Sequence, residues 1–108
     1  MKRQTVLEWE PRMLTYKAMF KFLPDGVHGE VLDFPGAITC ADTLADARRM
    51  LAGALVDVAE TSLLQGEQLP MPDPSATDNE SDLEEPIHLI LTAASNVRVV
   101  PEPEYETV

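Results

Sequence analysis

The fold is decided by residues 30–72, EVLDFPGAITCADTLADARRMLAGALVDVAETSLLQGEQLPMP. Strand-forming residues open this stretch and then stop at Pro35 and Gly36. Proline removes a backbone donor, and glycine frees the chain to turn. A short strand follows over residues 37–41, and a run of helix formers comes next. The stretch therefore predicts a strand, a tight turn, a second strand and a long helix.

The helix is predicted over residues 44–65. Thr43 stands where an N-terminal cap is expected, and Asp46 follows three residues later, close to a capping box. Gly66 occupies the place of a C-terminal glycine cap. The apolar residues form one helical stripe, made of Leu44, Ala47, Leu51, Ala54, Leu55, Val58 and Ala59.

The preceding residues predict a β-hairpin. Residues 14–22, LTYKAMFKF, alternate apolar and polar side chains with the period of a half-buried strand. The Pro24-Asp25-Gly26 sequence favours a turn, and residues 27–32 form the returning strand. Together with residues 37–41, these segments predict a three-strand antiparallel meander.

After the helix, residues 71–86 contain six acids and no base, which predicts a mobile acidic loop. The apolar run IHLILT, residues 87–92, predicts a strand inside the sheet, and residues 97–100 a further short strand. The fold class is therefore α+β, in the order β-β-β-α-β, with the helix on one face. A helical crossover would make the strand of residues 87–92 parallel to that of residues 37–41.

Charge is distributed unevenly along the 108 residues. Residues 1–24 carry five bases and two acids (+3), and residues 25–108 carry three bases and seventeen acids (−14), so the total is −11. Such a body repels phosphate backbones and would attract a basic partner. Taken by itself, the charge is better explained by solubility. The chain lacks a long apolar run or a secretory signal pattern and has a single cysteine, so a cytoplasmic location without membrane contact is expected.

Four short motifs stand in a fixed order: PDG at 24–26, DFPG at 33–36, ADTLADA at 41–47 and LLQGEQLPMP at 63–72. In this order and spacing the chain resembles the N-terminal domain of the HicB-like antitoxin family. The resemblance implies a partial RNase H-like fold without the catalytic carboxylates of the nuclease. It also implies a partner of the HicA kind, a small basic ribonuclease toxin whose active site the antitoxin masks.

The chain departs from the family pattern in three places. Ala41 stands where the family usually has glycine, and the acidic segment is longer than usual. Residues after the last strand are too few and too acidic for the DNA-binding module of many members, so no direct DNA binding is expected. The predicted organisation is an extension (1–13), a HicB-like domain (14–100, including the acidic loop) and an acidic tail (101–108).

No catalytic residue, cofactor or metal site is predicted. A two-metal nuclease site would need carboxylates converging from several elements. The acids close in sequence are explained by solvation, turns and helix capping; they are Glu30, Asp33, Asp42 and Asp46. His28 and His88 lack ligands at metal-binding spacing, and Cys40 is expected to be a small packed side chain.

Four residues are candidates for partner binding: Trp9, Asp33, Phe34 and Asp42. Trp9 would be an interface anchor if exposed, or would cover the domain's own core. Phe34 could anchor a partner, while turn geometry explains the proline and glycine that follow it.

The expected function is that of a non-enzymatic antitoxin-like protein that occludes a small basic RNA-cleaving toxin. The alternative is an orphan HicB-like module that assembles with itself or regulates another protein. Homodimers or larger homo-oligomers are expected in either case, because open edges of short strands need protection. A nuclease with residual metal-dependent activity is a further rival.

Overall fold

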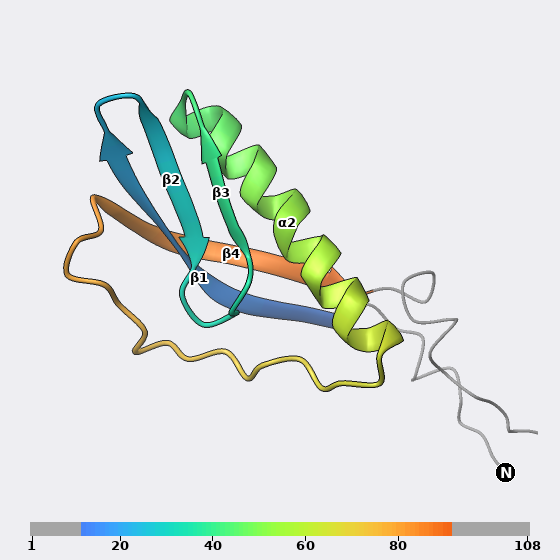
Figure 1. Cartoon of the computed structure of the whole chain (residues 1–108). Helices are drawn as coiled ribbons and strands as arrows, with labels where there is room; N and C mark the ends of the chain where they lie inside the picture. The colour runs from blue at the N-terminus through green and yellow to red at the C-terminus, as the bar shows by residue number, and fades with distance from the viewer. Residues whose placement is uncertain (1–11, 92–108) are drawn as a thin grey trace, which may run out of the picture.

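The computed structural model describes residues 12–91, in which four strands and one helix form an α+β fold (Figure 1). The elements are β1 (Arg12–Leu23), β2 (Gly26–Val31), β3 (Ile38–Ala41), α2 (Leu44–Leu64) and β4 (Leu83–Leu91). The predicted order β-β-β-α-β is confirmed. Within the described range, no helix is long and apolar enough to cross a membrane.

The four strands form one antiparallel sheet in the order β3-β2-β1-β4. The β1–β2 hairpin pairs Phe20 with Gly29, and β4 lies on the other side of β1, where Leu83 is opposite Phe20. Because β4 is antiparallel to β1, it also runs opposite to β3. The expectation that the last strand is parallel to residues 37–41 is therefore wrong.

β4 is also an edge strand, not the internal strand expected from its apolar sequence. It starts at Leu83, and Leu89 is its one fully buried residue. Its side chains alternate between the two faces, so the apolar run does not indicate burial on both sides. An edge position also accommodates Pro86, because proline cannot donate to a neighbouring strand.

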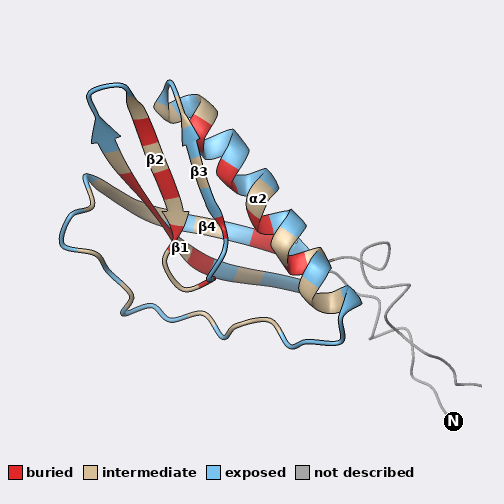
Figure 2. Cartoon of the chain, viewed as in Figure 1, coloured by how far each residue is buried: buried red, intermediate tan, exposed pale blue. Residues whose placement is uncertain are grey.

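The core lies between α2 and one face of the sheet (Figure 2). On β1, Tyr16, Ala18 and Phe20 alternate inward and are at most 2% exposed. The predicted stripe of α2 faces them, and its fully buried members are Ala47, Leu51, Leu55 and Ala59. The predicted amphipathic patterns of β1 and α2 are confirmed.

The ends of α2 also follow the sequence signals. The Thr43 hydroxyl accepts a hydrogen bond from the Asp46 backbone N–H at 3.1 Å, which satisfies one of the free donors of the first turn. Gly66 adopts a φ of +77° just after the helix, a conformation that glycine tolerates without a Cβ clash. The helix therefore starts and stops where its sequence indicates.

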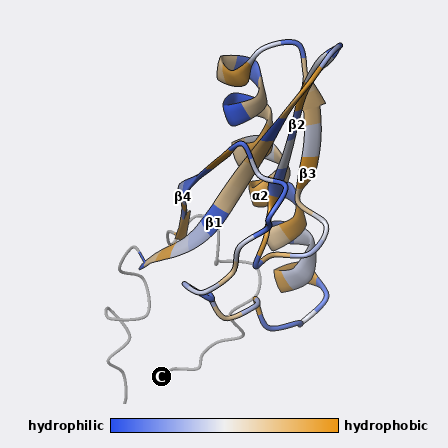
Figure 3. Cartoon of the chain, turned by 90° about the vertical axis from the view of Figure 1, so that its left-hand side faces the viewer, coloured by the Kyte–Doolittle hydropathy of each residue, from blue (hydrophilic) through white to orange (hydrophobic). Residues whose placement is uncertain are grey.

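Residues 65–82 connect α2 to β4 along a defined path below the sheet (Figure 1). In Figure 3, hydrophilic and more hydrophobic stretches alternate along this connection. The loop predicted over 71–86 is four residues too long, because residues 83–86 belong to β4. The connection is held through polar groups: Asp82 N–H donates to the Phe20 carbonyl at 2.9 Å, and the Tyr16 hydroxyl donates to the Pro70 carbonyl at 2.8 Å.

Lys17 and Lys21 place this connection on the face of the sheet opposite α2. Their side chains alternate with the inward residues of β1, and they bind the Ala76 carbonyl at 2.7 Å and the Glu80 carboxylate at 2.9 Å. Met19 lies between them on the same face and is only 1% exposed. The sheet is thus covered on both faces around the middle of β1.

Candidate functional site

Asp33 joins three segments that are distant in sequence. One carboxylate oxygen accepts the backbone N–H of Lys17 in β1, and the other accepts the backbone N–H of Asp73, both at 2.8 Å. The connection thereby becomes tied to the turn that follows β2. A hollow of about 250 Å³ lies beside this junction, between Pro74 and Pro86. The fold itself accounts for Asp33.

Phe34 lies in the core and is 3% exposed. Its ring meets Tyr16 edge to face, with the ring centroids 5.2 Å apart and the planes at 73°. This geometry is favourable for aromatic pairs. For Phe34 to anchor a partner directly, the ring would have to leave the core. Trp9, the other aromatic candidate, lies outside the described residues.

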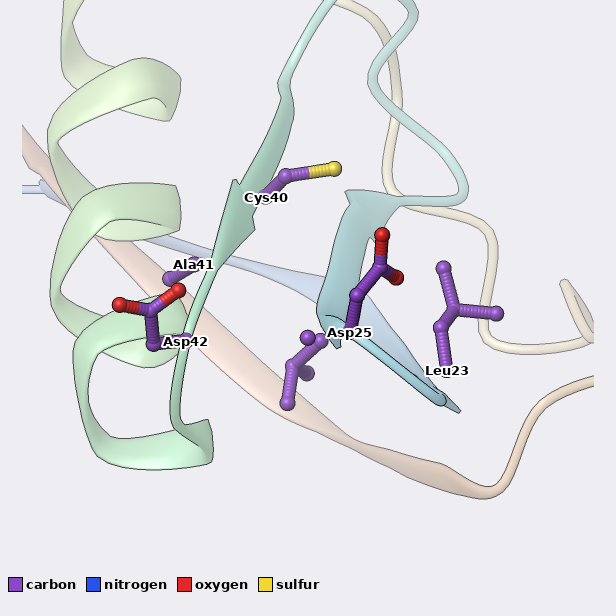
Figure 4. A pocket seen from close by; sticks show the side chains of 7 residues that line it. Leu23, Asp25, Cys40, Ala41 and Asp42 are labelled. Atoms are coloured by element: carbon purple, nitrogen blue, oxygen red, sulfur yellow. The ribbon is translucent and has the colours of Figure 1, made fainter.

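Asp42 is exposed at the end of β3, just before the cap of α2. It borders a hollow of about 210 Å³ that also touches the β1–β2 turn, where Asp25 and Leu23 lie (Figure 4). Neither Asp25 nor Asp42 has a cationic partner among residues 12–91. Leu23 and Phe22 are 43% and 52% exposed beside them.

We call these residues, Phe22, Leu23, Asp25 and Asp42, the turn-end surface. These residues bring two carboxylates without a cationic partner and two exposed apolar side chains to one end of the sheet. A partner that contacts this end with both basic and apolar groups would suit them. Sequence reasoning identified only Asp42. The alternation of residues 14–22 put Phe22 on the same face as the core residues, and only the structure shows that Phe22 and Leu23 are exposed.

The acids that a metal-dependent nuclease would need are far apart. Asp33 follows β2 and Asp42 follows β3, and these strands are antiparallel, so the two residues lie at opposite ends of the sheet. Asp46 pairs with Arg49 at 2.7 Å. Within residues 12–91, no three His, Cys, Asp or Glu side chains are placed to hold a metal ion.

Cys40 is exposed, contrary to the expectation of a packed side chain. It lies opposite His28 on the neighbouring strand, and its Sγ is 3.9 Å from His28 Nδ1. The other ring nitrogen, Nε2, is 3.3 Å from Glu30. The sequence spacing hid this cluster, because strand pairing brings together residues that are twelve positions apart.

Charge is only partly neutralised on the described surface. Residues 12–91 contain fourteen acids and five lysines and arginines. Four acids pair with these cations: Asp46, Glu80, Glu84 and Glu85. Others serve the connection as hydrogen-bond acceptors. Five carboxylates have neither an ion-pair nor a hydrogen-bond partner among residues 12–91, two of them at the turn-end surface (Asp25 and Asp42) and three elsewhere (Asp57, Glu60 and Glu67).

Glu84 accepts hydrogen bonds from two residues of the connection. The Asp78 backbone N–H donates to its carboxylate at 2.9 Å, and the Thr77 hydroxyl donates at 2.9 Å to the same oxygen. These bonds favour the charged form and lower the pKa of Glu84 from 4.5 to about 2. The pKa of Asp73 is also lowered, because the Ser75 hydroxyl and backbone N–H donate to it.

No protein-family model matches this chain, and no curated protein sequence matches it. Solved structures do share its fold. One is a chain of the "HicA3 and HicB3 toxin-antitoxin complex", with a TM-score of 0.50 and 19% identity over 71% of this chain and 94% of that chain. Another is a chain of the "Toxin-Antitoxin complex from Streptococcus pneumoniae", with a TM-score of 0.55 and 16% identity over 90% of this chain and 80% of that chain.

Proposed function

We propose that this protein is a non-catalytic, antitoxin-like binding protein that sequesters a small basic RNA-cleaving toxin of the HicA kind. The observation that carries the proposal is the shared fold with chains of two toxin–antitoxin complexes, one of them over 90% of this chain. The motifs PDG, DFPG and ADTLADA, on which the resemblance to the HicB-like antitoxin family rests, also support the proposal. Asp33 and Asp42 lie at opposite ends of the sheet, and this separation agrees with the proposal of a partial RNase H-like fold without catalytic carboxylates.

The proposed mechanism is occlusion. The net charge of −11 draws a basic toxin toward the surface and speeds the encounter. The turn-end surface then supplies carboxylates for lysine or arginine, and Phe22 and Leu23 supply apolar contact. Burial of the toxin's active site excludes RNA, so inhibition needs no reaction on the part of this chain.

Affinity capture of the tagged chain from its own host, followed by mass spectrometry, tests the proposal. Capture at low and moderate salt should return a stoichiometric small basic protein. That protein, once purified, should cleave RNA, and one equivalent of this chain should stop the cleavage. Recovery of the bait alone as a defined oligomer would favour the alternative, an orphan module that assembles with itself.

Two double variants locate the surface. Asp25→Asn with Asp42→Asn should slow toxin association by about tenfold at low salt, because steering charges at an interface act mainly on the association rate. Asp57→Asn with Glu60→Gln on α2 removes the same charge elsewhere and serves as the control. Equal effects of the two pairs would indicate that the total charge matters and the turn-end surface does not.

The remaining parts of the proposal concern assembly and location. The edges of β3 and β4 have no strand partner within residues 12–91, which supports a homodimer or larger homo-oligomer. Sedimentation velocity over a range of concentrations tests this, and a monomer throughout would exclude it. We place the complex in the cytoplasm and expect no direct DNA binding by this chain.

A further inference from the structure

β2 and β3 bring a thiol, an imidazole and a carboxylate together on the face of the sheet opposite α2. Cys40 Sγ lies 3.9 Å from His28 Nδ1, and His28 Nε2 lies 3.3 Å from Glu30 Oε1. His28 and Cys40 are direct cross-strand partners, and Glu30 is two residues further along the same face of β2. Strand pairing therefore fixes the relative position of all three groups.

The hydrogen-bonding capacity of the three groups sets the direction of proton movement. An ionised carboxylate only accepts, so the neutral imidazole must carry its proton on Nε2 to bond with Glu30. Nδ1 then holds a free lone pair that faces the Cys40 sulfur. This is the arrangement of an activated nucleophile: a thiol, a base beside it and a third group that orients the base.

Space for a reactant lies next to the sulfur. Cys40 lines the hollow of about 210 Å³ between β3 and the β1–β2 turn. In Figure 4 its side chain extends from β3 toward the side where Asp25 and Leu23 lie, while Asp42 points the other way. An exposed thiol that borders a hollow can meet a small molecule without rearrangement of the strands.

We propose that Cys40 is a reactive thiol that exchanges with small disulfides bearing a positive charge. The Cys40 proton passes to His28 Nδ1, and the thiolate attacks one sulfur of the disulfide. The S–S bond of the reagent breaks as the new bond to Cys40 forms, and the leaving thiolate takes up the proton from the imidazolium. Cys40 ends as a mixed disulfide, and one sulfur of the reagent is reduced to a thiol.

The preference for cationic reagents follows from two carboxylates near the thiol, Asp25 at the hollow and Glu30 beside His28. Asp25 lies on the side toward which the Cys40 side chain extends, and Glu30 lies behind His28. Neither carboxylate bonds a lysine or arginine within residues 12–91. Lys21, the neighbour of His28 in β1, is paired with Glu80 at 2.9 Å. Because these carboxylates are negative, the site repels anionic reagents and concentrates cationic ones.

The test is the second-order rate of mixed-disulfide formation on the full chain at pH 7, followed by mass spectrometry. The probes are cystamine, which is cationic, and glutathione disulfide, which is anionic. Each rate is divided by that of a capped peptide spanning residues 37–43, which carries the thiol without His28. Because the chain has one cysteine, every adduct reports on Cys40, and Cys40→Ser gives the blank.

The folded protein should exceed the peptide by about tenfold or more with cystamine, in line with the contribution of a positioned base. His28→Gln should remove this advantage. Glu30→Ala should remove part of it, and Glu30→Gln, which keeps an oxygen acceptor for Nε2, should restore most of the lost rate. Thermal melts establish that each variant is folded.

A matched pair of variants tests the preference for cationic reagents. Asp25→Asn should lower the relative rate with cystamine about threefold at low salt, while Asp57→Asn, on the exposed side of α2 and outside the hollow, should leave it within a factor of about 1.5. The proposal is overturned if folded protein and peptide react at the same rate with cystamine. It is also overturned if His28→Gln, still folded, reacts as fast as the parent chain.

Discussion

Asp33 accepts the backbone N–H of Asp73, forty residues later, at 2.8 Å. Its second oxygen accepts the backbone N–H of Lys17 at the same distance. The DFPG motif therefore does more than turn the chain after β2. Its aspartate holds β1 and the long connection in place, and the phenylalanine beside it fills the core.

Replacement of Asp33 should destabilise the whole fold. Asp33→Ala leaves two backbone donors without their acceptor, and we expect a loss of about 2–3 kcal/mol in the free energy of unfolding. Asp33→Asn keeps one oxygen and should lose less. Urea unfolding measures both, with Asp57→Asn on the exposed side of α2 as the control. A change within error for Asp33→Ala would show that water replaces the carboxylate at no cost.

Two glycines should respond to alanine in opposite directions. A Cβ on Gly29 would lie 2.9 Å from the Phe20 ring and 3.3 Å from the Thr39 methyl group, so Gly29→Ala should cost about 1–3 kcal/mol. Gly53 in α2 has nothing within 4 Å of such a Cβ, and Gly53→Ala should gain about 0.5–1 kcal/mol. Thermal or urea unfolding of the pair checks the packing of β1 on β2.

Phe34 should matter for folding before it matters for any partner. Phe34→Ala removes a ring that is 3% exposed and should cost about 3–5 kcal/mol. Phe34→Leu, which keeps most of the volume, should lose less and retain partner binding. Weak binding by a well-folded Phe34→Leu protein would instead point to direct contact between this ring and the partner.

Glu84 should make the protein sensitive to acid. Its pKa is about 2 in the folded state against 4.5 without its hydrogen bonds. Its contribution to stability is therefore fully present above about pH 5 and is lost as the pH falls toward 2. Glu84→Gln should be less stable than the parent chain at pH 7, and the difference between the two should shrink over that interval.

Urea titrations at pH 7, 5, 4 and 3 measure this difference. Glu67→Gln is the control, because this side chain is exposed and accepts no hydrogen bond within residues 12–91. A difference between Glu84→Gln and the parent chain that stays constant with pH would mean that the carboxylate is not held in its charged form.

The local elements of the fold were predictable because each is written in neighbouring residues. The alternation of residues 14–22, the Thr43 cap and the apolar stripe of α2 all depend on contacts within a few positions. Burial then follows the same patterns, as at Tyr16 and Leu51. The direction and place of β4 depend on long-range pairing with β1, and no local pattern specifies them.

The connection shows why composition alone misleads. Six acids in residues 71–86 indicate too little apolar surface to order the chain, yet Lys17, Lys21 and Asp33 supply hydrogen bonds from other elements. The candidate sites have the same origin. Cys40 and His28 become neighbours only through strand pairing. Asp25 and Asp42 border the same hollow only because the β1–β2 turn and the end of β3 lie at the same end of the sheet.

The pairing of Arg12 with Leu91 brings the two ends of the described chain together. β1 then runs eleven residue steps to Leu23, so the turn-end surface lies about 36 Å further along this strand. A reporter or a second domain could be joined at either end, or the whole unit spliced into a loop of another protein. In each arrangement the turn-end surface would face away from the attachment and remain open to the medium.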